Sequence, residues 1–382
     1  MNRVKNTKVF RIAIMASIAT GILFLSQCKP EDKPMIPDPY QDEPYTLTVP
    51  KGFPPPVLST SNPLTVHGVE LGRKLFYDPI LSGDNTQSCA SCHNQATSFT
   101  DAPNKFSKGI DGIVGNKNSM AIINMAWNRD FFWDGRSTSL EKQTLEPVSN
   151  PIEMHESWSN AIKKLQADTS YTNLFKKAFG TDKADSTLAA RAMAQFMKTI
   201  VVSESKFQKF LRKETLLTDA ERRGYAVFIS EEAGDCFHCH MVYDALFTDN
   251  YVSDPVQRFH NNGLDPEPAA GIFTGRALIT NNPADIGKFK TPTLLNVALT
   301  PPYMHDGRFN TLEEVVEFYN SGVHASRTLD VNMNIKPQAS NRTFENGVRN
   351  LHLSQQQKDD LVAFLKTLTD PTIATNPAYS KP

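Results

Sequence analysis

One short motif, present twice, constrains the fold of this 382-residue chain more than any other feature. Two cysteines separated by two residues are followed directly by a histidine, at 89–93 and again at 236–240. The chain holds only 9 histidines, so two chance matches at this spacing would be rare. Such a cysteine pair can add across the two vinyl groups of one haem, and the adjacent histidine can reach the iron. We therefore predict two covalently bound haem c groups, attached through Cys89, Cys92, Cys236 and Cys239, with His93 and His240 as axial ligands.

Two other chemistries use the same residue types. A set of two cysteines and a histidine could hold a structural zinc ion, but each motif would then need a fourth ligand. The cysteine pair could also be a redox-active dithiol. An exported chain favours covalent haem over both alternatives.

The N-terminus predicts export. The first 27 residues have a basic start and an uncharged run from Ile12 to Leu25, which is short for a membrane span. We interpret them as a signal peptide, with a membrane anchor as the alternative. The run ends in Leu-Ser-Gln-Cys, which resembles a bacterial lipoprotein box, so we expect Cys28 to carry lipid and to anchor a periplasmic protein to a membrane. Residues 28–57 contain 9 of the 25 prolines and are predicted to be an extended tether.

The charge balance excludes one class of partner. Four of the 40 Lys and Arg side chains precede residue 28 and none of the 41 Asp and Glu do, so the remaining chain has a net charge of −5. A nucleic-acid binder would be expected to carry a basic surface instead.

The chain also repeats itself. A shift of 172 residues aligns 119–141 with 291–313, with seven identities in 23 positions. Each copy follows one cysteine motif, which indicates two related haem domains in tandem. We place them at 58–214 and 215–372, and we treat 373–382 as a tail.

The predicted secondary structure is mainly helical. Helical patterns and caps occur at 70–77, 185–211, 218–230, 311–319 and 354–368. We expect the last of these helices to pack against the helix over 218–230, which precedes the second cysteine motif.

Several longer motifs now carry a resemblance to a known family. They are Phe-Trp-Asp-Gly-Arg at 132–136, Asn-Pro-Ile-Glu-Met at 150–154, Lys-Thr-Pro-Thr-Leu-Leu-Asn at 290–296 and Pro-Tyr-Met-His-Asp-Gly-Arg at 302–308. In this order, and with the two cysteine motifs, they resemble the bacterial di-haem cytochrome c peroxidase family, which includes the MauG proteins. The match runs from about Leu64 to Leu368.

The resemblance implies two cytochrome-c-like domains with different tasks. The N-terminal haem would react with peroxide, and the C-terminal haem would receive electrons from outside. Trp133 would lie between the haems, although a buried aromatic at the domain interface would explain it equally well. The family also implies one calcium ion, held by the Asn118 side chain and the backbone carbonyls of Thr300 and Pro302; a short polar loop would otherwise explain Asn118.

The same resemblance implies the catalytic residues. Glu153 would move a proton between the two oxygens as the peroxide bond breaks, and Gln143 would hold peroxide or water by hydrogen bonds. Considered without the family, both are polar residues that would normally be solvated. His155 is the rival distal base.

Two departures from the best-known peroxidases affect the mechanism. Those enzymes close the first haem with a histidine from the loop before the calcium-binding asparagine, and residues 106–118 here contain no histidine. We therefore expect an open distal side. Their second haem has a methionine ligand at the position that Tyr319 occupies in this chain. A tyrosine at this position resembles the MauG arrangement and predicts that Tyr319 is the ligand. A core aromatic residue is the alternative reading of Tyr319, and the other candidate ligands are Met241, Met304 and Met333.

We thus expect a peroxidase that reduces hydrogen peroxide to water with electrons from a small cytochrome c. The rival enzyme is a MauG-like oxidase that uses peroxide to modify a protein or a small molecule. The rival from another class is a di-haem electron carrier without catalysis. Members of the family are often dimers, which leaves a homodimer open.

Overall fold

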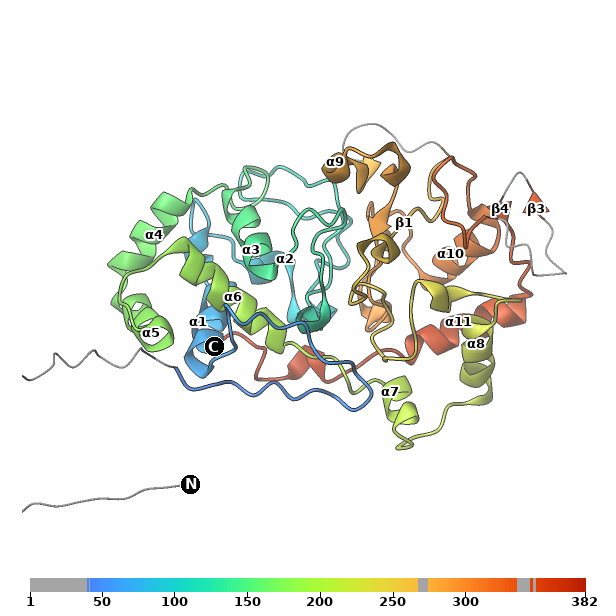
Figure 1. Cartoon of the computed structure of the whole chain (residues 1–382), viewed down its shortest axis with the longest axis horizontal. Helices are drawn as coiled ribbons and strands as arrows, with labels where there is room; N and C mark the ends of the chain where they lie inside the picture. The colour runs from blue at the N-terminus through green and yellow to red at the C-terminus, as the bar shows by residue number, and fades with distance from the viewer. Residues whose placement is uncertain (1–39, 41, 267–273, 335–343, 346–347) are drawn as a thin grey trace, which may run out of the picture. The chain divides into compact units, whose positions relative to one another are not determined.

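Short helices joined by long loops make up most of this computed structural model, which describes residues 40, 42–266, 274–334, 344–345 and 348–382 (Figure 1). The mainly helical fold class is confirmed. The helices are α1 (Val66–Tyr77), α2 (Cys89–Cys92), α3 (Leu140–Ser149), α4 (Trp158–Ala167), α5 (Thr169–Phe179), α6 (Ser186–Thr199), α7 (Lys206–Leu211), α8 (Asp219–Ile229), α9 (Ala277–Thr280), α10 (Leu312–Glu317) and α11 (Gln355–Lys366). Two antiparallel pairs of very short strands join β1 (Phe259–His260) to β2 (Phe289–Lys290) and β3 (Phe344–Glu345) to β4 (Val348–Arg349).

The N-terminal predictions fall mostly beyond this part of the chain. The export signal, Cys28 and the tether up to residue 39 lie outside the described residues. Within the described ranges, no helix has the length and apolar character that crossing a membrane requires.

Two pairs of crossing helices frame the molecule. Helix α1 packs on α6, and α8 packs on α11, as predicted for the helix over 354–368. A glycine stands at each crossing because the helices approach too closely for a side chain. A Cβ atom on Gly72 would lie 1.9 Å from the Ala192 carbonyl oxygen, and one on Gly224 would lie 1.9 Å from that of Asp360.

The two copies of the sequence repeat adopt the same local structure. Asn124 and Asn296 both have a left-handed backbone, with φ of 53° and 60°. Each side-chain oxygen accepts a backbone N–H from the segment after the partner helix, from Val202 at 2.9 Å and from Asp370 at 2.7 Å. A short 3-10 turn follows each asparagine, and α3 and α10 begin at the repeat-equivalent Leu140 and Leu312.

The predicted helix over 185–211 is interrupted. Helix α6 ends at Thr199 and α7 begins at Lys206. Between them, the backbone turns toward Asn124, which donates its N–H to the Ile200 carbonyl oxygen at 2.8 Å and accepts the Val202 N–H. A contact across 78 residues therefore ends a helix that local propensity would continue.

Residues 40–382 pack as one unit, and the proposed boundary between the two haem domains stays a prediction. The tether also stays a prediction, and its C-terminal end contacts the folded part of the chain. The Trp127 indole donates to the Pro54 carbonyl oxygen at 2.7 Å, and the Phe53 ring packs edge-on against the same indole at 5.2 Å. The prolines keep this segment extended, and its apolar side chains pack against the buried Trp127.

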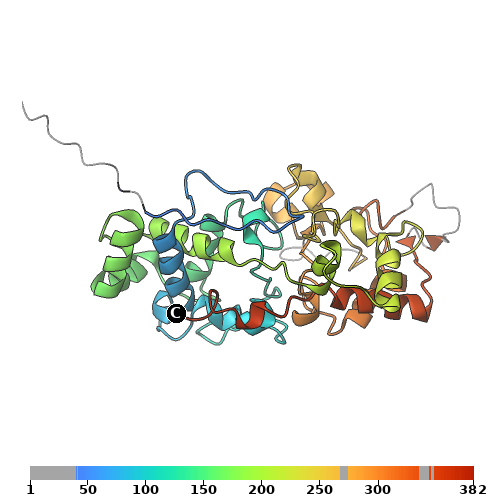
Figure 2. The same ribbon diagram turned by 90° about the horizontal axis from the view of Figure 1, so that it is seen from below.

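The tail folds back onto the N-terminal half. Gln95 donates its amide to the carbonyl oxygens of Ile373 and Asn376, at 2.8 and 2.9 Å. Arg73 binds the carbonyl oxygens of Pro377 and Ser380. Figure 2 shows this red segment beside the cyan segment that follows α2.

Candidate haem sites and active site

Both predicted axial histidines are oriented by a backbone carbonyl. His93 donates its Nδ1 hydrogen to the Phe99 carbonyl oxygen at 2.8 Å, and His240 contacts that of Phe247 at 3.3 Å. Phe99 and Phe247 are fully buried and have left-handed φ values of 57° and 54°. A carbonyl acceptor at Nδ1 fixes the ring and leaves Nε2 as the atom that can bind a metal.

One cavity of about 640 Å³ reaches both cysteine motifs. Its walls include Cys89, Cys92, Cys236, Cys239 and both motif histidines. Burial raises the pKa of the Cys89 and Cys236 thiols to about 12, so these sulfurs are uncharged near neutral pH. Burial also lowers the pKa of His240 to about 4 and that of His93 below its usual value, which keeps each imidazole neutral, as an iron ligand must be.

The residues therefore fit two thioether-linked haems: paired uncharged sulfurs, a neutral oriented imidazole beside each pair, and an apolar cavity in front. Among the described residues, no group of three His, Cys, Asp or Glu side chains converges as a metal-binding cluster.

Glu153 lies on the cavity wall near the first motif, and Gln143 reaches the same cavity from α3. The Glu153 carboxylate accepts the Asn150 amide at 2.7 Å, and burial raises the pKa of Glu153 above its usual range. The loop over 107–115 lies against this residue, because Ile110 donates its N–H to the Glu153 carbonyl oxygen at 3.0 Å. The position suits a carboxylate that exchanges protons with a ligand in the cavity.

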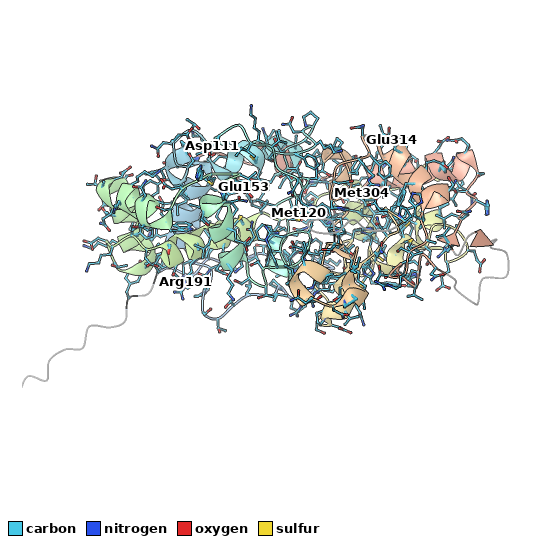
Figure 3. All side chains as sticks on the ribbon, turned by 90° about the horizontal axis from the view of Figure 1, so that it is seen from above. Asp111, Met120, Glu153, Arg191, Met304 and Glu314 are labelled. Atoms are coloured by element: carbon cyan, nitrogen blue, oxygen red, sulfur yellow. The ribbon has the colours of Figure 1, made fainter. Side chains whose placement is uncertain are left out.

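His155 points elsewhere. Its side chain is 56% exposed, pairs with Asp111 at the surface and does not line the cavity. Figure 3 shows Asp111 nearer the edge of the molecule than Glu153, and Met120 between Glu153 and Met304. The geometry thus favours Glu153 over the rival base.

Trp133 lies where the two halves of the chain meet. Its indole donates to the Asn118 carbonyl oxygen at 2.9 Å, and its ring faces the edge of His305 with centroids 6.4 Å apart. His305 in turn stacks on Phe289 at 3.8 Å. The indole also lines the cavity that reaches both cysteine motifs. Its role between the two haems stays a prediction.

Tyr319 faces the cavity from the turn after α10, close to the second motif. Its hydroxyl accepts the Asn262 amide at 3.1 Å. Burial raises the pKa of Tyr319 to about 12, and the hydrogen bond from Asn262 acts in the opposite direction. The position is that of a residue able to reach the second haem.

The methionine alternatives divide into two groups. Met304 and Met333 line the same cavity as Tyr319. Met241 does not, and its sulfur accepts the Tyr251 hydroxyl at 3.3 Å. The structure therefore leaves Met304 and Met333 beside Tyr319 as candidate ligands.

The three predicted calcium residues, Asn118, Thr300 and Pro302, all line the cavity. Asn118 donates its backbone N–H to the His305 carbonyl oxygen at 2.8 Å and its side-chain amide to that of Lys105 at 3.1 Å.

Sequence reasoning missed two residues of the second site. Asn262 contacts Tyr319, and His260 lies between the carboxylates of Asp249 and Asp330, at 2.7 and 2.6 Å. Neither residue belongs to a recognisable motif, and the only available signal was a lone polar cluster at 260–262.

Comparison with known proteins agrees with this geometry. Residues 66–216 match the family described as di-haem cytochrome c peroxidase. The chain is 34% identical to the methylamine utilization protein MauG of Methylorubrum extorquens, over 83% of this chain and 82% of that protein. It is 34% identical to the cytochrome c551 peroxidase of Nitrosomonas europaea, over 78% and 79% of the two chains.

A solved structure shows the same similarity. A MauG-like protein associated with microbial copper homeostasis superposes with a TM-score of 0.75 and 33% identity, over 88% of this chain and 99% of that one. The di-haem peroxidase BthA of Burkholderia thailandensis, at 24% identity and a TM-score of 0.67, shares the fold.

Proposed function

Because this chain belongs to the di-haem cytochrome c peroxidase family and is an oxidoreductase acting on peroxide, we propose that it reduces hydrogen peroxide to water with electrons from a small cytochrome c. The chain carries two covalently bound haem c groups. One peroxide molecule, two electrons and two protons give two water molecules. The observation that supports this most directly is Glu153, a buried carboxylate on the wall of a cavity that also contains a haem-binding motif.

The haem supplies the redox chemistry when bound, and the surrounding residues supply protons and orientation. Glu153 accepts a proton from one peroxide oxygen and returns it to the departing oxygen. Its raised pKa brings this exchange closer to neutral pH than an exposed glutamate would allow. Gln143 holds peroxide or water by hydrogen bonds without titrating. His93, oriented by the Phe99 carbonyl oxygen, would hold the iron of this haem.

Cys236, Cys239, His240 and Tyr319 would hold the C-terminal haem, which would supply the entry point for electrons from the donor. Trp133 would lie on the electron path between the two haems, and its position on the wall of the shared cavity supports this role.

The Asn118 side chain and the carbonyl oxygens of Thr300 and Pro302 would hold a calcium ion. Support comes from their common position at the cavity wall, next to Trp133. Removal of calcium with a chelator should lower peroxide turnover, and added Ca²⁺ should restore it. Full turnover in the calcium-free protein would contradict this assignment.

The protein is a periplasmic lipoprotein anchored through Cys28. Cys28→Ser should move the protein from the membrane fraction to the soluble fraction. A variant that remains in the membrane fraction would contradict the lipid anchor.

The protein forms a homodimer. A monomeric mass in light scattering would contradict the dimer.

A second candidate is a MauG-like oxidase that uses peroxide to modify a protein or small molecule. It is favoured by Tyr319 on the cavity wall, by the absence of histidine from 106–118, and by 34% identity to MauG. Phenolate ligation stabilises ferric iron, which would make the second haem a poor acceptor for electrons from a cytochrome.

The test measures peroxide turnover by the ferric protein as isolated, with a reduced small cytochrome c or a non-protein dye as electron donor. Fast oxidation of the cytochrome supports the peroxidase. Slow oxidation of the cytochrome together with fast oxidation of the dye supports the MauG-like oxidase. Turnover with neither donor, and an entirely low-spin spectrum, would instead indicate an electron carrier.

A further inference from the structure

Asn262 contacts two of the candidate ligands of the second haem at once. Its amide nitrogen lies 3.1 Å from the Tyr319 hydroxyl oxygen and 3.6 Å from the Met304 sulfur. All three residues line the cavity that contains Cys236 and Cys239. One amide group therefore stands between an oxygen ligand and a sulfur ligand for the same iron.

The backbone on both sides of Asn262 is held firmly. His260 precedes it by two residues, pairs with Phe289 in β2 and bonds through both ring nitrogens to Asp249 and Asp330. On the other side, Gly263 accepts the His324 N–H at 2.8 Å.

The neighbouring Asn261 adds a third attachment. Its side-chain amide donates to the hydroxyls of Ser326 and Thr328, at 3.0 and 2.9 Å, and its carbonyl oxygen accepts the Asp330 N–H at 2.9 Å. The backbone contacts thus fix the position of the Asn262 amide. The side chain of Tyr319 or Met304 has to adopt a conformation that reaches it.

Hydrogen-bond chemistry ranks the two acceptors. A phenolate oxygen can accept an N–H while another of its lone pairs binds iron, and a hydrogen bond to an anion is stronger than one between neutral groups. A thioether sulfur is only a weak acceptor. The same amide therefore stabilises Tyr319 oxygen at the iron more than it stabilises Met304 sulfur there.

We propose that Asn262 is a positioning residue that selects Tyr319 over Met304 as the axial ligand of the C-terminal haem. This inference rests on the proposed ligation by Tyr319. It assigns the choice of ligand to a residue outside the recognised motifs.

The test uses the full-length protein with both haems and reads the ligand by spectroscopy. Resonance Raman and electron paramagnetic resonance spectra of the ferric protein report the iron–phenolate bond. In Asn262→Leu, which removes both N–H donors at similar size, the phenolate signal should fall at least twofold. Asn262→Asp also removes the donors and keeps the shape, so it should give the same loss if the leucine variant fails to fold. Asn310→Leu, the same change at an exposed asparagine, should leave the spectrum unaltered.

A double variant separates selection from simple packing. If Asn262 chooses between two ligands, Met304→Leu in the Asn262→Leu background should restore the phenolate signal. If Met304→Leu does not reverse the loss of the phenolate signal, the selection role of Asn262 is overturned. It is also overturned if the phenolate signal is unchanged in both Asn262→Leu and Asn262→Asp.

Tyr319→Phe distinguishes failure of this inference from failure of the proposed ligand. If the spectrum of Tyr319→Phe equals that of the wild type, Tyr319 is not the ligand. Both the proposed ligand and the role of Asn262 are then overturned. If Tyr319→Phe removes the phenolate signal while Asn262→Leu and Asn262→Asp retain it, only the role of Asn262 is overturned.

Discussion

The two histidines predicted to bind haem iron, His93 and His240, depend on an unusual backbone conformation six or seven residues further along the chain. Phe99 and Phe247 adopt left-handed φ, which costs free energy for a residue with a bulky side chain. In both cases the conformation turns a carbonyl oxygen toward the histidine Nδ1. Each phenylalanine ring is buried in the apolar core, and the free energy gained by that burial offsets the cost of the left-handed backbone.

Glu153 should control the pH dependence of turnover. Burial raises its pKa, and only the carboxylate can accept a proton, so the rate should fall as pH drops through a value above that of an ordinary glutamate. Glu153→Gln should lower turnover by about 10² and remove this acidic limb. Steady-state rates with a dye donor across the acidic range would measure both effects.

The matched control is His155→Gln, an exposed position two residues away, which should retain the wild-type rate and profile. A haem count of two in each variant would exclude loss of cofactor. Unchanged turnover in Glu153→Gln would remove this residue from the chemistry.

Tyr319→Met should convert the second haem into a better electron acceptor. A neutral thioether stabilises ferrous iron relative to a phenolate, so the reduction potential should rise on the order of 100 mV, within the ~0.8 V range that axial ligands cover. Potentiometric titration of the two haems would measure the shift, and oxidation of reduced cytochrome c should accelerate in parallel. A potential that stays constant would show that Tyr319 does not bind the iron.

At the scale of elements, the crossing of α8 and α11 depends on Gly224. In an ordinary helix position, alanine would be preferred to glycine by up to about 1 kcal/mol. Here the added Cβ would meet the Asp360 carbonyl oxygen at 1.9 Å, so the helices must separate. Gly224→Ala should therefore lower the free energy of unfolding by about 2 kcal/mol, as overpacked cores usually do.

Chemical denaturation followed by circular dichroism would measure this change. Gly115→Ala is the control, because the nearest atom to its added Cβ, the Ser107 carbonyl oxygen, lies at an ordinary 3.4 Å. Equal stability of Gly224→Ala and the wild type would show that the crossing can relax without cost.

Elements with a local signal were predictable from sequence. The capping boxes at Thr218 and Thr311 formed as expected, because they involve residues three positions apart. The break after Thr199 and the contact of Asn262 with Tyr319 depend on partners 57 to 78 residues away. A single sequence does not show which distant residues will be in contact, so it gives no sign of either feature. The cysteine motifs could be found because their spacing is itself the signal, whereas Glu153 was indicated only by the resemblance to the family.

At the scale of the whole molecule, the sequence repeat reappears as reciprocal contacts between its copies. A shift of 172 residues relates Asn118 to Lys290 and Trp133 to His305. Asn118 donates its N–H to the His305 carbonyl oxygen, and Lys290 donates its N–H to the Trp133 carbonyl oxygen, both at 2.8 Å. Such an exchange, in which each copy offers the other the same group, is typical of a two-fold interface between identical subunits.

This symmetry is broken where the side chains differ. Trp133 occupies in one copy the position that His305 occupies in the other, and their rings meet at the interface. The backbone contacts keep the two copies in register, and the side chains at these positions can differ without disturbing it. One half of the chain therefore contributes Glu153 to the cavity wall and the other contributes Tyr319, in line with the different tasks proposed for the two haems.

The C-terminal segment connects α11 to the N-terminal half of the chain, close to the predicted ligand His93. After α11, Ile373 is buried in the core, and residues 373–380 accept hydrogen bonds from Gln95, Arg73 and Tyr77. Gln95 lies only two residues after the predicted ligand His93. Removal of 373–382 should lower the thermal midpoint by about 5 to 10 °C, since each hydrogen bond contributes about 1 kcal/mol and Ile373 adds its burial. It should also perturb the spectrum of the first haem more than that of the second.

A shorter truncation separates the two effects. Removal of 378–382 deletes the contacts of Ser380 with Arg73 and of Tyr379 with Tyr77, but it keeps those of Gln95 with Ile373 and Asn376. Calorimetry should show a smaller loss of stability, and the first haem should keep its wild-type spectrum. If both truncations left the spectrum of the first haem unchanged, the segment would stabilise the contact between the two halves without supporting His93. The loop from Asn94 to Phe99 would then hold the orientation of His93 without help from the C-terminal segment.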